Sequence, residues 1–104
     1  MAQAVGMVEV YGLVAAFAAC DAGCKAADVT VENFDKNKPA NPDGLPVPLQ
    51  VLVKFRGSVE SVTAAVEAAV DAANAISGVV TKHVIPAMDE SAEGMLKLNA
   101  FDKN

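Results

Sequence analysis

Residues 49–78 read LQVLVKFRGSVESVTAAVEAAVDAANAISG, a strand followed after one turn by a helix. From Leu49 to Phe55 every second residue is apolar, which predicts a strand with one face in the core. After this strand the apolar spacing changes to three or four residues, which predicts an amphipathic helix. Ser58 is a suitable N-cap and Gly78 a suitable C-terminal stop. The stretch therefore predicts one strand–helix unit.

The helix of this unit has two different sides. Glu67 and Asp71 lie on the side that the periodicity assigns to solvent, and alanines are interleaved with them. Small residues on an outward side allow another backbone to approach closely. The expected apolar stripe consists of Val59, Val62, Val66, Ala69, Val70, Ala73 and Ile76.

The same two spacings of apolar residues, every second residue and every third or fourth, recur through the chain and predict six elements. We expect strands at residues 5–10, 29–34, 49–56 and 79–85, and helices at residues 13–27 and between Ser58 and Gly78. In the first helix Asp21 and Lys25 are spaced as an (i, i+4) ion pair. The apolar face expected for it consists of Leu13, Ala16, Phe17, Cys20, Cys24 and Ala27.

This element order predicts the fold class. β-α-β-β-α-β is the order of a ferredoxin-like α+β domain, a four-stranded antiparallel sheet with two helices on one face. We assign residues 1–88 to this domain and residues 89–104 to a C-terminal extension. The extension carries four candidate docking residues, Met95, Leu96, Leu98 and Phe101.

Residues 35–48, DKNKPANPDGLPVP, differ in composition from the rest of the chain. They contain four of the five prolines and an Asp-Gly pair, so we expect a long loop. Loops of this length inside compact domains are uncommon and usually functional.

Composition excludes several classes of protein. The 104 residues are enough for one domain, and the net charge of −5 excludes a typical nucleic-acid binder. The longest apolar run is about nine residues, far short of a membrane span, so we expect a soluble cytoplasmic protein. The 20 alanines and 16 valines make a small core without a deep pocket. Such a domain gains further burial against copies of itself.

The residues that could carry chemistry are few. Cys20 and Cys24 lie one helical turn apart and have no further ligand nearby, so we interpret them as small core residues. His83, the only histidine, lies within an apolar strand, and we interpret it as structural because nothing marks a nucleophile for it to serve. We therefore expect no catalytic site, no cofactor and no metal.

Four stretches in the correct order resemble one family. They are VGMVEVYGLVAA at residues 5–16, CDAGCKAADV at residues 20–29, KFRGSV at residues 54–59 and VTKHVIP at residues 80–86. Together they are similar to bacterial microcompartment shell proteins of the single-domain, hexamer-forming class, the BMC domain.

The resemblance implies a structural role and a set of partners. Such a protein forms a flat homohexameric tile that packs with other shell proteins around enzymes in the cytoplasm, with a central pore for small metabolites. Lys25 falls on the family's edge lysine, which contacts the next hexamer. The segment that falls on the pore lining comprises Asp35, Lys36, Asn37, Lys38, Pro39, Ala40, Asn41, Pro42, Asp43 and Gly44.

Two features depart from the family pattern. An arginine usually follows shortly after the His-Val-Ile-Pro sequence, whereas Ala87, Met88 and Asp89 follow it here. The pore segment is normally a short Gly/Ser-rich turn, whereas residues 35–48 are longer and rich in proline. We expect this loop to narrow, gate or reshape the pore.

Two other functions are compatible with the same scaffold. One is a regulatory module in which residues 35–48 close over a small-molecule effector. The other is a small enzyme that uses His83 and an acidic residue. Both follow from the fact that a ferredoxin-like fold hosts many unrelated functions.

Overall fold

The computed structural model describes residues 3–99 and residue 101 of the chain. Residues 1–2 of the expected domain, and residues 100 and 102–104 of the expected extension, lie outside the described residues. The elements are β1 Ala4–Tyr11, α1 Leu13–Ala26, β2 Thr30–Asn37, β3 Gln50–Gly57, α2 Val59–Asn74, β4 Val79–Ile85 and α3 Glu90–Glu93. Single turns of 3-10 helix occupy Pro42–Gly44 and Gly94–Lys97.

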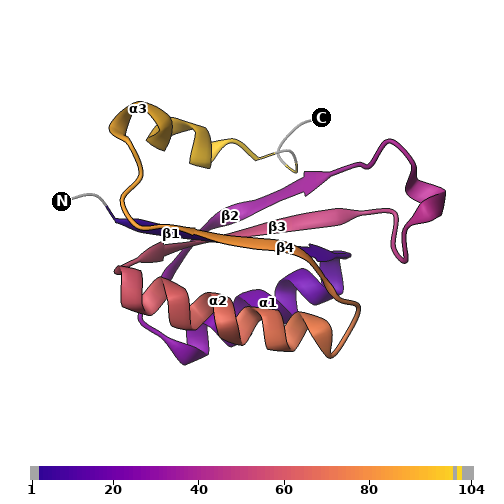
Figure 1. Ribbon diagram of the computed structural model, residues 1–104, viewed down its shortest axis with the longest axis horizontal. Helices are drawn as coiled ribbons and strands as arrows, with labels where there is room; N and C mark the ends of the chain where they lie inside the picture. The colour runs from indigo at the N-terminus through magenta and orange to yellow at the C-terminus, as the bar shows by residue number, and fades with distance from the viewer. Residues whose placement is uncertain (1–2, 100, 102–104) are drawn as a thin grey trace.

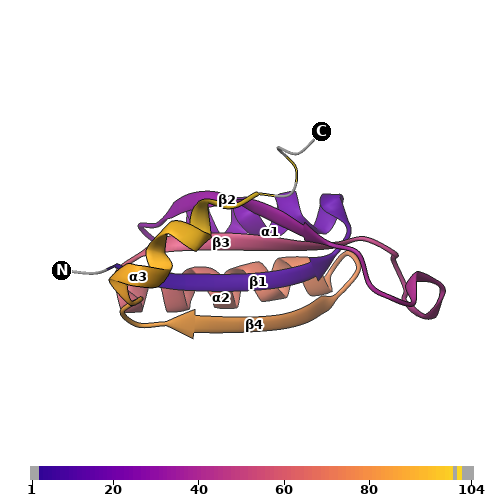
Figure 2. The same cartoon turned by 90° about the horizontal axis from the view of Figure 1, so that it is seen from above.

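The four strands form one sheet in the order β2-β3-β1-β4, and every neighbouring pair is antiparallel. Helices α1 and α2 cover one face, while α3 lies over the other (Figure 1). Viewed from above, β2 and β4 are the two edges of the sheet (Figure 2). The ferredoxin-like α+β fold expected from the element order is confirmed.

The strand register fixes what lies at each end of the molecule. At one end Ala4 pairs with Gly57 and Val5 with Ile85. At the other end Asn37 pairs with Gln50, and the β2–β3 loop continues beyond this pair (Figure 1). Because α1 ends just before β2 begins, its C-terminus lies at the end opposite the loop.

Strand β2 is longer than the sequence suggested. Residues 35–37 were expected to open the loop, yet Asp35, Lys36 and Asn37 pair with β3 and belong to the strand. Their intrinsic β propensity is low, but β3 begins at Gln50 and its backbone supplies pairing partners for all three residues. The loop therefore begins at Lys38.

The core lies between the sheet and the two long helices. Val51, Val53 and Phe55, the expected core face of β3, are fully buried, and valines of β1 lie beside them. The helices contribute small residues to the same core. They are Ala15, Ala16 and Ala19 from α1, with Val62, Ala65, Val66, Ala69 and Ala73 from α2.

The apolar face expected for α1 is wrong by a partial rotation of the helix. Phe17 is 62% exposed and Cys24 is exposed, whereas Ala15, Ala19 and Gly23 face the core. A Cβ atom placed on Gly23 would lie 2.5 Å from Cζ of Phe55. The helix therefore packs with its smallest residues inward, because the backbone approaches the sheet too closely for larger ones.

Both ends of α2 have the expected capping residues. The hydroxyl oxygen of Ser58 accepts a hydrogen bond from the backbone N–H of Ser61 at 3.1 Å. At the other end the N–H groups of Ser77 and Gly78 donate to the carbonyl of Ala73, and Gly78 has a φ of 118° that favours glycine. The helix ends before Ile76, which is half exposed, so the expected stripe is shorter than the sequence suggested.

Gly23→Ala tests the close approach of α1. Added helix propensity favours the variant, but the clash with buried Phe55 outweighs it, so unfolding free energy should fall by about 1–2 kcal/mol. Gly94→Ala is the matched control because nothing lies within 4 Å of its added Cβ. Urea denaturation at one protein concentration measures both; equal stability of the two variants would contradict the packing argument.

Candidate functional site

The loop of residues 38–49 projects from one end of the molecule, beyond the ends of α1 and α2 (Figure 1). Its base is fixed on two sides. Asn37 donates a side-chain hydrogen bond to Gln50 at 3.4 Å, and the backbone N–H of Gly12 donates to the carbonyl of Leu49 at 2.8 Å. The loop is therefore a defined projection on a rigid base.

Only part of the expected pore segment lies on this projection. Lys38, Ala40, Asn41, Asp43 and Gly44 are exposed. Pro39 is half-buried, and Pro42 begins the 3-10 turn of the loop. The loop therefore presents one exposed lysine and one exposed aspartate.

Lys36 lies instead against the C-terminal segment, defined here as residues 89–99 with Phe101, and Asp35 lies beside Lys54, which contacts this segment. The carboxylate of Asp35 is 3.7 Å from the ammonium group of Lys54. The ammonium group of Lys36 lies 5.4 Å from the ring centroid of Phe101, within cation–π range. Lys36 therefore contacts the C-terminal segment directly, and Asp35 pairs with a lysine that contacts it, roles that the sequence did not indicate.

Lys54 anchors the C-terminal segment. Its ammonium group donates to the carbonyls of Leu96 at 3.0 Å and Leu98 at 2.9 Å, and its side chain is 95% buried. Asn33 donates to the same Leu96 carbonyl at 3.1 Å. Leu96 is buried as a result, whereas Met95 and Leu98, two other candidate docking residues, are mostly exposed.

Arg56 holds the segment at a second point. One guanidinium nitrogen donates to Glu93 at 2.9 Å and another to Glu32 at 3.1 Å. Its side chain is largely buried, so solvent screens these ion pairs less than it would at the surface. The sequence did contain a signal for this docking. Lys54 and Arg56 place two charges on the same face of β3, and four apolar residues follow near the C-terminus.

Lys25 lies near the C-terminus of α1, at the end of the molecule opposite the loop. The expected ion pair with Asp21 is confirmed at 2.8 Å. The hydrogen bond and charge of Asp21 raise the pKa of Lys25, which therefore carries a positive charge at neutral pH. Both side chains are largely exposed, so the pair contributes little stability and leaves the lysine available to a neighbour.

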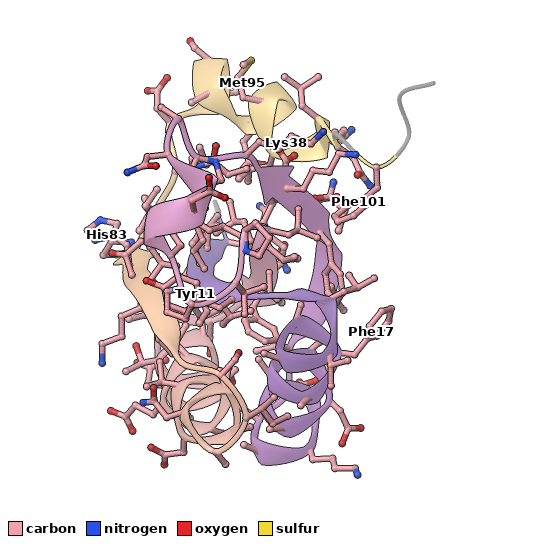
Figure 3. All side chains as sticks on the ribbon, turned by 90° about the vertical axis from the view of Figure 1, so that its right-hand side faces the viewer. Tyr11, Phe17, Lys38, His83, Met95 and Phe101 are labelled. Carbon is pink, nitrogen blue, oxygen red and sulfur yellow. The ribbon has the colours of Figure 1, made fainter. Side chains whose placement is uncertain are left out.

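The remaining candidate residues lie apart from one another. Burial, with smaller contributions from Cys24 and Asp21, raises the pKa of the Cys20 thiol to about 11. Cys20 packs against the core, but Cys24 is exposed, so the core interpretation is right for the first cysteine only. His83 was expected within the apolar strand, yet its side chain is exposed because β4 is an edge strand (Figure 3).

Residues 3–99 and 101 lack both a metal-binding cluster and a membrane-spanning helix. These residues contain no group of three or more His, Cys, Asp or Glu side chains that could hold a metal ion. None of their helices combines the length and apolar character needed to cross a membrane.

Residues 4–88 match the family model described as the BMC domain. The chain is 35% identical over 100 residues to the carboxysome shell protein CcmK2 of Synechocystis sp., covering 94% of this chain and 88% of that protein. It is 38% identical over 94 residues to the bacterial microcompartment shell protein PduA of Salmonella typhimurium, covering 90% of each chain.

A solved structure agrees on the fold. The chain superposes on a microcompartment protein from Desulfitobacterium hafniense with a TM-score of 0.71 at 24% identity, over 93% of this chain. This chain spans 48% of the length of that protein. At 24% identity the similarity shows a shared fold and nothing more.

Lys54→Met tests the anchor of the C-terminal segment. Losing both carbonyl contacts should lower unfolding free energy by about 1–3 kcal/mol and release the segment. Limited trypsin digestion should then cleave at exposed Lys97 faster than in the unaltered protein. Lys82→Met removes an exposed lysine as the control, and equal cleavage rates in both variants would exclude the anchoring role.

Proposed function

The chain belongs to the BMC domain family, and from this premise we propose that six copies form a shell tile with a central pore. Its relatives are shell proteins, so the chain is a structural component of a bacterial microcompartment shell rather than an enzyme. Association with other shell proteins follows from the same membership. The family thereby decides against the regulatory module and the His83 enzyme that the sequence left open.

The positions of the loop and Lys25 carry the hexamer proposal. They lie at opposite ends of the longest axis, which extends 43 Å. A cyclic assembly that brings six loops to its axis therefore places six Lys25 residues on its rim. Pore and tile-to-tile contact are then separate parts of each subunit.

The loop supports a pore that is narrowed and lined by balanced charge. Each copy contributes exposed Lys38 and Asp43, so six copies bring equal numbers of positive and negative groups to the axis. The prolines restrict the loop backbone and limit how far it moves. Such a ring selects by size more than by the sign of the permeant charge.

The rim has a lysine but lacks the usual arginine. Ala87 and Met88 follow β4 at the same end as Lys25, where the family pattern has the arginine. To reach a neighbouring tile, the ammonium group of Lys25 must either break its exposed ion pair with Asp21 or keep that pair while also contacting the neighbour. We propose that the rim contact rests on Lys25 alone among the basic residues at this end.

Lys25→Ala should retain hexamers and lose extended sheets. Six rim lysines are removed per tile, while the loop and core are unchanged. Size-exclusion chromatography with light scattering measures the hexamer, and negative-stain microscopy detects sheets or tubes. Lys97→Ala, an exposed lysine on the C-terminal segment, is the control. A monomeric unaltered protein would refute the tile itself; sheets formed equally by both variants would refute only the rim role.

Replacing residues 39–47 by Gly-Ser-Gly should widen the pore. The Asn37–Gln50 pair closes the hairpin and remains intact, so the fold should survive. Leakage of a small neutral solute from assembled shells should rise by about tenfold, because removal of the projecting loop widens the constriction. A Lys38→Gln and Asp43→Asn double variant keeps the loop length and should leave leakage of a neutral solute unchanged. Unchanged leakage after shortening would contradict the proposal.

A further inference from the structure

Most of the exposed large apolar side chains belong to two segments, the start of α1 and the C-terminal segment, which cover opposite faces of the sheet. Among the described residues eight are exposed, and six belong to the start of α1 or to the C-terminal segment. The six are Leu13, Val14, Phe17, Met95, Leu98 and Phe101. A single exposed apolar residue is ordinary, whereas a group on adjacent elements indicates an interaction surface.

Four of the chain's apolar side chains form a continuous surface around strand β2. The rings of Phe17 and Phe34 pack edge to face, with centroids 5.1 Å apart. They line a groove of about 340 Å³ together with Leu13 and Phe101. We call these four residues, Leu13, Phe17, Phe34 and Phe101, the aromatic edge.

The aromatic edge contains three of the four phenylalanines in the chain. Figure 3, which looks along the long axis from the loop end, shows Phe17 and Phe101 on one flank and His83 on the opposite flank. Strand β2 is an outer strand of the sheet, so backbone groups along it are also available to a partner.

The aromatic edge is already ordered in the isolated subunit. Phe101 lies beneath the ammonium group of Lys36, and the C-terminal segment that carries it is fixed by the buried Lys54. A surface already ordered in the free subunit loses little conformational entropy on binding.

One polar atom in the groove indicates what kind of occupant fits. Asn33 also lines the groove, and its side-chain carbonyl oxygen, which is buried just behind the lining, accepts no hydrogen bond within the described chain. A buried acceptor without a donor costs about 1–3 kcal/mol, so an occupant with both apolar area and a hydrogen-bond donor is favoured. A protein surface meets both requirements, whereas a lipid tail meets only the first.

We propose that the aromatic edge is the surface through which one copy of this chain binds the β4 flank of the next copy. The inference rests on the proposed function, because a ring with loops at its axis and Lys25 at its rim leaves the β2 and β4 flanks to face the two neighbours. A ring contact pairs two different surfaces, and closure requires that they be complementary.

The β4 flank has the features of a receiving surface. A shallow groove of about 160 Å³ runs between α2 and β4, lined by Val66, Val84 and four polar residues. Lys82 and His83 on this flank are exposed and carry hydrogen-bond donors. The β4 flank therefore offers apolar groups for the exposed aromatic rings and donors of the kind that Asn33 lacks.

The proposal assigns the C-terminal segment a part in assembly. Phe101 belongs to the aromatic edge although it lies after the matched domain, which ends at residue 88. Loss of this side chain should weaken association between subunits while leaving the sheet and its two long helices unchanged.

Phe17→Ser and Met95→Ser form a matched pair for the test. Phe17 is 62% exposed and Met95 is 63% exposed, but only Phe17 belongs to the aromatic edge. Light scattering over a dilution series measures the concentration at half assembly, and circular dichroism checks the fold. Phe17→Ser should raise this concentration at least tenfold, roughly the effect of removing one central interface residue, and Met95→Ser should not.

Phe101→Ser tests the contribution of the C-terminal segment in the same assay and should also weaken assembly. Normal assembly of folded Phe17→Ser, or equal loss in Met95→Ser, would overturn the assignment of the aromatic edge while the tile proposal stands. Normal assembly of Phe101→Ser would overturn the part assigned to the segment. Failure of the unaltered protein to assemble at any concentration would instead remove the proposed function, and this inference with it.

Discussion

The close approach of α1 to the sheet is the constraint on which the rest of the molecule depends. Ala15, Ala16, Ala19 and Gly23 face the core because the buried ring of Phe55 lies directly against the helix. The largest side chains of α1, such as Phe17, are therefore displaced to its outer sides. This packing explains why Phe17 is exposed. In our proposal the exposed Phe17 contacts the neighbouring subunit.

A second layer stabilises the opposite face of the sheet. The C-terminal segment covers β3 through the carbonyl contacts of buried Lys54 and the ion pair between Arg56 and Glu93. A buried charge is tolerated where it is paired and hydrogen-bonded. Lys54 meets both conditions, and Arg56 meets them through its two terminal nitrogens, while its buried Nε has no hydrogen-bond partner among the described residues. The segment is thus part of the folded domain in its contacts, although it lies outside the matched residues 4–88.

Much of the fold could be predicted because it depends on local spacing. The alternation in β3, the cap at Ser58 and the stop at Gly78 each require only neighbouring residues. The errors arose where a distant element decided the outcome. Asp35, with low β propensity, lies in a strand because β3 supplies a partner, and His83 is exposed because β4 has a neighbour on one side only.

The candidate site divides in the same way. The sequence by itself determined the order of the elements, the Asp21–Lys25 pair and the existence of a long proline-rich loop, because these follow from periodicity, helical spacing and backbone restriction. Only the tertiary structure decided which side of α1 is buried, which charges reach the loop and where the C-terminal segment docks. Those outcomes depend on steric fit and ion pairing between residues far apart in the chain, such as Gly23 with Phe55 and Lys54 with Leu96.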